Sequence, residues 1–198
     1  RPTPSPPIHR SRAVADLEGQ LSAISRSHKG QATPAAFEET LSCIVGHIAR
    51  LFEVSLDEVA VLLRRHRGGN EILRFAYPLE FLRAGRTEFP VKGTKPSFAG
   101  RTLGSREPLL VNRAAVERHL DAFEKIPTQE RAGLLIQRLM SVPLWGGPGN
   151  PIGVLQVSRK GPTPEESGPE FTPEDLAGLA TTGQQVGPYL LRVTPRDF

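Results

Sequence analysis

The side chains that could take part in covalent chemistry are few in this sequence. Cys43 is its only cysteine, so the chain cannot form an internal disulfide, a multi-cysteine zinc site or a reductase centre with a resolving thiol. The Gly-Gly pairs at 68–69 and 146–147 are typical of hairpin turns, because no helix start follows them as it would in a phosphate-binding loop. Neither a Ser-His-Asp arrangement nor a metal-ligand spacing can be assembled. We therefore expect no catalytic residue and no metal, and the single thiol favours a reducing, cytoplasmic compartment.

A few side chains could instead bind a ligand. His119 could ligate haem iron, but a solvated helix histidine is more common, so haem is not supported. Arg101 lies one turn into a predicted short helix capped by Ser97, where it could pair with an anionic ligand beside free backbone N–H groups or form a surface salt bridge. Cys43 and His47 fall outside the apolar face of a helix predicted over 33–52. We expect His47 to be exposed, and Cys43 to be exposed or at a helix–helix contact with a structural role.

Charge and hydropathy exclude two classes of partner. The net charge is only +4, and the densest basic cluster, at 64–67, adjoins a Gly-Gly-Asn turn and is interpreted as a solvated hairpin tip. Only 6% of the residues are aromatic, and no stacking pattern is visible, so we expect no nucleic-acid partner. The apolar runs are much shorter than the ~20 residues that span a bilayer, which predicts no membrane partner.

The N-terminal region divides into two segments. Residues 1–9 contain Pro2, Pro4, Pro6 and Pro7 and are predicted to form an extended linker. Residues 10–30 form a helical extension, because apolar residues recur at spacings of three and four: Val14, Leu17, Leu21 and Ile24. This stripe favours equally a coiled-coil seam and a helix packed on its own domain. The absence of an initiator Met favours a fragment or a processed chain, and no secretory signal is visible.

The rest of the chain alternates helices with hairpins. Phe37, Leu41 and Ile44 begin the apolar face of the helix at 33–52. Thr172 and Pro173 have the residue types of an N-cap and a first helical position, which predicts the start of the last helix. Between these helices the sequence predicts strands at 58–65, 71–77, 88–91, 109–111, 139–145 and 152–159, and a short helix at 97–103. Because the strands form hairpins rather than βαβ units, we expect an α+β fold with an antiparallel sheet.

Three passages in this order resemble the GAF domain family. They are FAGRTLGSREPLLVN at 98–112, SVPLW followed by PIGVLQV at 141–157, and FTPEDL at 171–176. The resemblance covers residues 33–192, and we assign 31–192 to the domain and 193–198 to a polar tail. It implies a profilin-like, three-layer arrangement with a central antiparallel sheet of five or six strands. The N- and C-terminal helices would cover one face, and short helices and loops would enclose a small-molecule pocket on the other.

The resemblance also limits the ligand. Members of the family bind cyclic nucleotides, bilins, haem or small acids, a few reduce free methionine sulfoxide, and many only dimerise. A covalent bilin needs a thiol between the short helix and the late hairpin, whereas Cys43 lies in an early helix, so bilin is not expected. Free methionine sulfoxide reductases need several cysteines. Residues 112–124 lack the cyclic-nucleotide signature of the phosphodiesterase type, so the cofactor or ligand stays unknown.

The resemblance finally assigns candidate residues and a role. The pocket would be lined by Phe89, Phe98, Arg101, Leu110, Asn112, Phe123, Met140, Val142 and Gln156. The dimer seam would contain Val14, Leu17, Leu21, Ile24, Leu176, Leu179, Val186 and Leu190. We expect a regulatory, homodimeric, small-molecule-sensing module of a larger bacterial-type signalling protein, which relays ligand state through its terminal helices to an output domain on the same polypeptide. The alternative is a ligand-free structural dimerisation domain with a filled core.

Overall fold

The computed structural model describes residues 7–78, 88–92, 96–113 and 135–198, with side chains from residue 16 onward. Its elements, in chain order, are α1 (Pro7–Ser27), α2 (Pro34–Phe52), the 3-10 helix η1 (Leu56–Glu58), β1 (Val59–Arg67), β2 (Asn70–Tyr77), β3 (Glu88–Pro90), α4 (Phe98–Ser105), β4 (Leu109–Val111), β5 (Leu135–Trp145), β6 (Pro151–Gly161) and α5 (Pro173–Val193). The expected α+β class is confirmed.

One six-stranded sheet forms the middle of the molecule, in the order β3-β2-β1-β6-β5-β4. Every neighbouring pair is antiparallel, as the hairpin pattern predicted. β5 and β6 are the longest strands and pair along most of their length, with Ser141 opposite Gln156 and Met140 opposite Val157. This register matters below because successive side chains of a strand point to opposite faces of the sheet.

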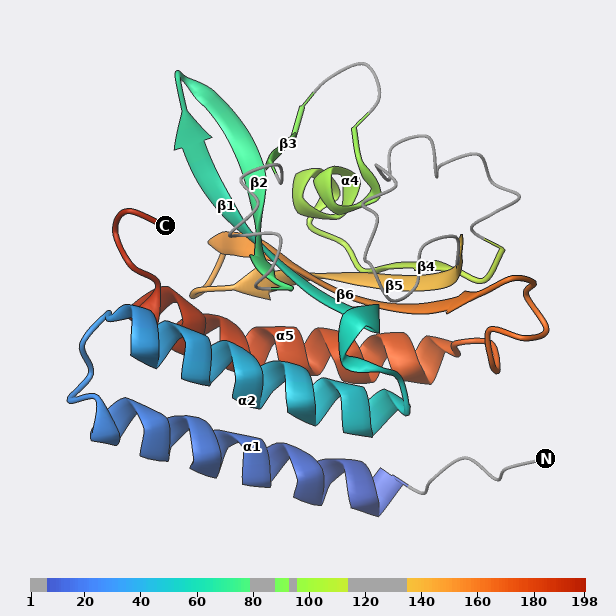
Figure 1. Cartoon of the computed structure of the whole chain (residues 1–198), viewed down its shortest axis with the longest axis horizontal. Helices are drawn as coiled ribbons and strands as arrows, with labels where there is room; N and C mark the ends of the chain where they lie inside the picture. The colour runs from blue at the N-terminus through green and yellow to red at the C-terminus, as the bar shows by residue number, and fades with distance from the viewer. Residues whose placement is uncertain (1–6, 79–87, 93–95, 114–134) are drawn as a thin grey trace.

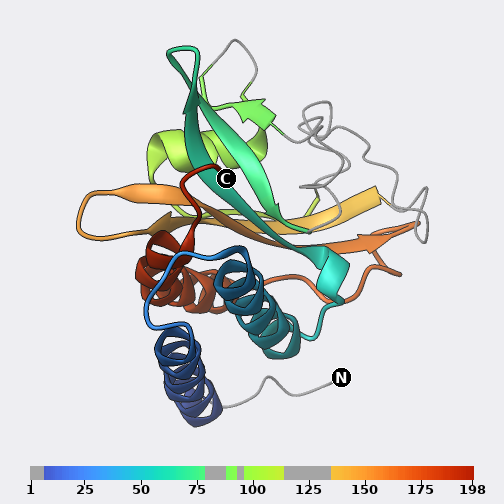
Figure 2. The ribbon, with the colours of Figure 1, turned by 60° about the vertical axis from the view of Figure 1, so that its left-hand side comes forward.

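Helices cover the two faces of the sheet unequally. α2 and α5 lie side by side on one face, and α1 lies outside them (Figure 1). The view in Figure 2 shows α4 alone among the described helices on the opposite face. The helix-side core contains the apolar stripe of α2, including Leu41 and Ile44, and the alternate sheet residues Val61 and Leu155. A smaller core lies under α4.

Local sequence signals explain the helix ends. Thr33 accepts a hydrogen bond from the amide of Ala36 at 3.1 Å, and Pro34 takes the first helical position of α2, where a missing N–H costs nothing. The predicted start of α5 is confirmed, since Thr172 and Asp175 form a reciprocal capping box.

The N-terminal boundary differs from the prediction. α1 already begins at Pro7, so the expected linker over 1–9 loses its last residues to a helix that proline can start. The tail expected over 193–198 follows α5, which ends at Val193, and it packs on the domain, because Phe198 is buried in the helix-side core. Residues 1–6 lie outside the described part of the chain.

Candidate functional site

The candidate site is built around α4. Ser97 accepts a hydrogen bond from the amide of Gly100 at 3.0 Å and so caps the helix, as the sequence predicted. Gly100 permits a close approach, because a Cβ atom there would lie 3.3 Å from the carbonyl oxygens of Pro90 and Val91. The helix ends at Ser105 and is followed by the capping residue Arg106, whose φ of 62° is left-handed. These local features hold α4 between the β3 segment and β4.

A buried polar cluster fixes α4 to the sheet. The hydroxyl oxygens of Thr102 on α4 and Ser141 on β5 lie 2.7 Å apart, and the amide nitrogen of Gln156 on β6 donates to Ser141 at 3.2 Å. The Thr102 hydroxyl also lies 3.1 Å from the carbonyl oxygen of Phe98. Thr102 and Ser141 are fully buried and Gln156 is nearly so. Because unpaired buried polar groups are costly, this chain of contacts defines one position of α4 on the sheet.

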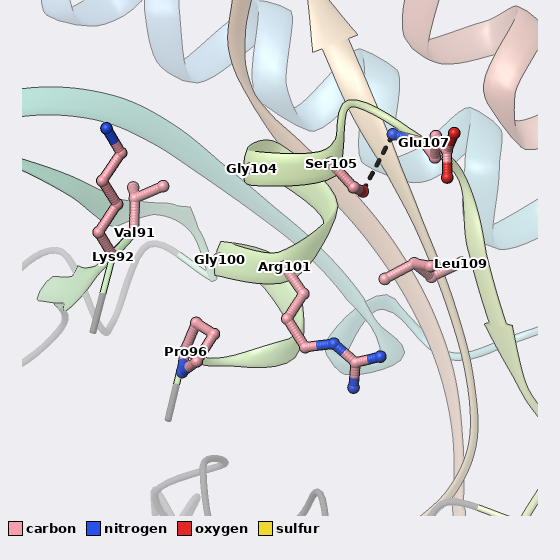
Figure 3. Close-up of a pocket in the computed structure, with 9 residues that line it drawn as sticks. All are labelled: Val91, Lys92, Pro96, Gly100, Arg101, Gly104, Ser105, Glu107 and Leu109. Carbon is pink, nitrogen blue, oxygen red and sulfur yellow. Dashed lines mark hydrogen bonds between the residues drawn. The ribbon is translucent and has the colours of Figure 1, made fainter. Parts of the chain in front are cut away.

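An open groove of about 460 Å³ runs along the outer side of α4. It is lined by Val91, Lys92, Pro96, Gly100, Arg101, Gly104, Ser105, Glu107 and Leu109. Figure 3 shows that the side chains of Lys92 and Arg101 extend away from one another, and that Glu107 lies at the other end of the helix. The lining combines apolar side chains, the backbone of α4 at its glycines and charged side chains that lie apart from one another. It suits reversible binding of a small polar molecule better than bond-breaking chemistry, which needs converging groups.

The predicted pocket residues are distributed differently from the expectation. Arg101 lines the groove and is exposed, with its guanidinium 5.7 Å from the centre of the Phe98 ring. Phe98 is itself buried. Phe89 packs edge-on against Phe75 at 5.6 Å, within the core under α4. Phe123 and His119 lie outside the described residues.

Three other pocket candidates were assigned to the wrong face of the sheet. Leu110, Met140 and Val142 belong to the core that faces α2 and α5. Ser141 pairs with Gln156 and faces α4. Because successive side chains of a strand point to opposite faces, Met140 and Val142, the neighbours of Ser141 on β5, point to the face that α2 and α5 cover. Gln156 does face α4, as expected, but it is buried beneath the helix and does not line the groove.

Asn112 has a structural role instead of the expected ligand contact. Its side-chain amide donates to the carbonyl of Phe171 at 2.9 Å, and its carbonyl accepts from the amide of Phe171 at 3.0 Å. This reciprocal pair attaches the segment before α5 to the end of β4. The residues that sequence reasoning missed are Thr102 and Ser141. The available signal was local: Ser141 is a polar residue between the apolar Met140 and Val142, and Thr102 precedes the apolar Leu103.

The predicted dimer seam is largely occupied within the single chain. Five of its residues are buried in the helix-side core and cannot meet a second copy in this arrangement: Leu17, Leu21, Leu179, Val186 and Leu190. Ile24 and Leu176 are half-buried, and the side chain of Val14 is outside the described part. Of the two alternatives for the first helix, the structure has the helix packed on its own domain.

The contact between α1 and α2 also corrects the expectation for His47. This histidine is buried, not exposed, and its Nε2 has no hydrogen-bond partner. Burial lowers the pKa of His47 and Arg50 lowers it further, whereas Asp16 raises it. Cys43 lies at the same helix–helix contact, where its thiol donates to Gln20 at 3.4 Å. Burial raises the pKa of Cys43, which disfavours the reactive thiolate.

A family model for the GAF domain matches residues 36–190. The chain belongs to the GAF domain family. The match contains all three passages that carried the resemblance, and it makes the chain a member of a class of signalling and sensor modules found in multidomain proteins. No curated protein matches the chain.

Several solved structures share the fold, a GAF domain among them. The GAF domain of an Acinetobacter phosphoenolpyruvate-protein phosphotransferase superposes with a TM-score of 0.58 at 16% identity, covering 87% of this chain and 91% of that one. Residues 122 to 287 of a methyl-accepting chemotaxis protein give 0.57 at 15% identity, covering 88% and 96%. A free methionine-R-sulfoxide reductase from Thermoplasma acidophilum gives 0.51 at 14% identity, covering 80% and 96%. At these identities the likeness establishes the fold alone.

Two features are absent from the described residues. No helix there has the length and apolar character needed to cross a membrane. In the same part of the chain, no three His, Cys, Asp or Glu side chains come together in a way that could hold a metal ion.

Proposed function

We propose that this GAF domain is a regulatory, non-enzymatic sensor module that binds a small polar molecule in the groove along α4 and passes the bound state to α5. The observation that carries the proposal is the position of β5 between the two helices. Ser141 of β5 contacts Thr102 of α4 on one face of the sheet. On the other face, Gly183 of α5 lies against the carbonyl of Pro143, where a Cβ atom would be 2.9 Å from the oxygen.

The route through β5 is short and closely packed. Thr102 sits one residue after the groove-lining Arg101, so a ligand that shifts α4 also strains the buried contact to Ser141. Gly187, one turn beyond Gly183, lies so close to Trp145 that a Cβ atom would be 2.1 Å from its carbonyl oxygen. We therefore expect α5 and β5 to move together. A ligand acts only if it binds one arrangement of α4 more tightly than the other.

Neither the charged side chains of the groove nor the thiol of Cys43 is arranged for bond-breaking chemistry. The charged side chains of the groove diverge (Figure 3). The one cysteine is remote from the groove, at the contact between α1 and α2, and has a raised pKa. A homodimer and an output domain on the same polypeptide complete the proposal. Sedimentation velocity measures the oligomeric state directly.

The test is a thermal-shift and calorimetric screen of amino acids, 2-oxo acids, cyclic nucleotides and haem against the chain and two variants. Gly104→Leu fills the groove, since a Cβ atom at Gly104 meets nothing within 4 Å. Arg106→Gln is a control that removes a neighbouring exposed charge outside the lining. We expect a compound that stabilises the wild type and the control but not Gly104→Leu. A compound that stabilises all three equally would place the ligand elsewhere.

The second candidate function is the ligand-free structural dimerisation domain. It is favoured by the filled core between α4 and the sheet, where Leu62, Leu103 and Val154 leave the groove on the outer side only. A screen without any stabilising compound, together with a dimer in sedimentation, would favour this function over the sensor.

A further inference from the structure

The segment that follows α5 turns back toward the sheet. α5 ends at Val193, and the amide and hydroxyl of Thr194 both donate to the carbonyl of Leu190, at 2.9 and 2.6 Å. Pro195 then prevents helical continuation, and its carbonyl accepts from the amide of Phe198 at 3.2 Å. Figure 1 shows the end of the segment beside the β1–β2 hairpin and away from the axis of α5.

Phe198 enters a socket formed by three elements that lie far from it in sequence, namely α2, β1 and β2. Its ring packs edge-on against Phe37, in the first turn of α2, with the ring centres 5.1 Å apart. The guanidinium carbons of Arg65 on β1 and Arg74 on β2 lie 5.5 and 5.2 Å from the ring centre. Only 9% of Phe198 is exposed. An aromatic ring suits this socket because its edge meets one ring while its electron-rich face attracts cations.

A hydrogen bond supplements the ring contacts. Arg65 donates from Nη2 to the carbonyl oxygen of Arg196 at 2.9 Å, so one arginine holds both the ring and the backbone of the segment. Arg65 and Arg74 belong to the two strands of one hairpin. The contact thus joins the end of α5, the start of α2 and the β1–β2 hairpin at one point.

We propose that residues 194–198 form a strap that closes on the socket of Phe37, Arg65 and Arg74 and couples the β1–β2 hairpin to the end of α5. The strap is a second connection between sheet and terminal helix, independent of the groove on α4 and of the proposed ligand. Its closed state is held by one ring and one backbone hydrogen bond. It can therefore open locally without unfolding the domain, in the way that small peripheral contacts open in native proteins.

The test is hydrogen–deuterium exchange of the full chain in three variants. Phe198→Ala removes the ring, Phe198→Leu keeps apolar volume without the aromatic face, and Asp197→Ala is a control at an exposed neighbour. For Phe198→Ala we expect exchange to rise about fivefold or more at residues 34–41 and 62–76, and to stay unchanged at 139–157. Phe198→Leu is expected to show part of this rise, and Asp197→Ala none.

The outcomes separate a strap from an ordinary core residue. Unchanged exchange at both segments in Phe198→Ala would overturn the coupling. A rise of equal size throughout the chain would also overturn it, because Phe198 would then support global stability only. Wild-type exchange in Phe198→Leu would refute recognition of the ring by the two arginines. Arg65→Gln combined with Arg74→Gln gives an independent check, since it leaves Phe198 intact and is expected to accelerate the same two segments.

Discussion

Replacing Gly187 by alanine tests the close packing of α5 on β5. A Cβ atom at this position would lie 2.1 Å from the carbonyl oxygen of Trp145, 2.6 Å from its carbonyl carbon and 2.8 Å from its nitrogen. All three are backbone atoms of a strand in the sheet, so no flexible side chain can move aside. α5 or β5 would have to shift by roughly 1 Å to restore ordinary contact distances.

The size of the effect follows from two opposing terms. Overpacking of this kind costs about 1–3 kcal/mol and sometimes more, and the rigid surroundings favour the upper end of that range. Replacing glycine by alanine in a helix interior gains at most about 1 kcal/mol, because Pro188 follows Gly187 and disfavours the helical conformation for a residue with a Cβ atom. The expected net loss in the free energy of unfolding is therefore about 2 kcal/mol. For a chain of this size that loss lowers Tm by roughly 4–8 °C.

The assay is thermal and urea unfolding followed by circular dichroism, with Gly46→Ala as the matched control. Gly46 lies inside α2, and a Cβ atom there meets only the end of the flexible Arg50 side chain, at 3.6 Å. The control is expected to be as stable as the wild type or more stable by up to about 1 kcal/mol. A Gly187→Ala protein that equals or exceeds the wild type in stability would refute the reasoning.

Three further predictions concern the buried polar side chains His47 and Thr102 and the half-buried Asn112. Because burial lowers the pKa of His47, the unfolded chain takes up a proton at a higher pH than the folded chain does. The contribution of neutral His47 to the free energy of unfolding is therefore complete above about pH 6.5 and is lost as the pH falls further. His47→Met is expected to flatten this part of a pH series of urea melts. Thr102→Val leaves the buried Ser141 hydroxyl with one partner fewer and is expected to cost about 1–3 kcal/mol by the same melts, whereas a neutral result would mean that α4 is not fixed by the cluster. Asn112→Ala removes both hydrogen bonds to the backbone of Phe171. Hydrogen exchange at residues 168–175 is expected to rise, and the free energy of unfolding from the melts is expected to fall by about 1–3 kcal/mol. Unchanged exchange at these residues would contradict the structural role of Asn112.

Local patterns predicted most of the fold. The apolar stripe of α2 beginning at Phe37, the hairpin turn at 146–151 and the cap at Thr172 each depend on a few neighbouring residues, and all three are found where they were expected. The order of hairpins excluded parallel crossovers and so predicted the antiparallel sheet. The family resemblance added the arrangement of the layers, which no local pattern contains.

Contacts between distant elements could not be predicted in the same way. A stripe such as Leu17 and Leu21 shows that a helix buries one side, but it has the same spacing whether the partner is a second copy or its own domain. His47 was expected to be exposed because it lies off the stripe that packs on the sheet. A second helix, α1, covers that side of α2.

The candidate site was harder to predict than the fold because it depends on which face of the sheet each residue occupies. The strands were located correctly, yet Met140 and Val142 were placed with Gln156 although the register separates them. A pairing register derived from the hairpin turn would have revealed Ser141 as the neighbour of Gln156. The position of α4, and therefore of Thr102, required the tertiary structure.

The cluster of Thr102, Ser141 and Gln156 has a consequence for how a guest molecule would be received. Sliding α4 by one turn would break the contact between Thr102 and Ser141, which joins α4 to the strand pair that Gln156 and Ser141 connect, so α4 has one preferred position while the groove is empty. A preformed wall spares an arriving molecule the entropy cost of ordering it. Selectivity at such a wall then comes from shape and from the exposed guanidinium of Arg101.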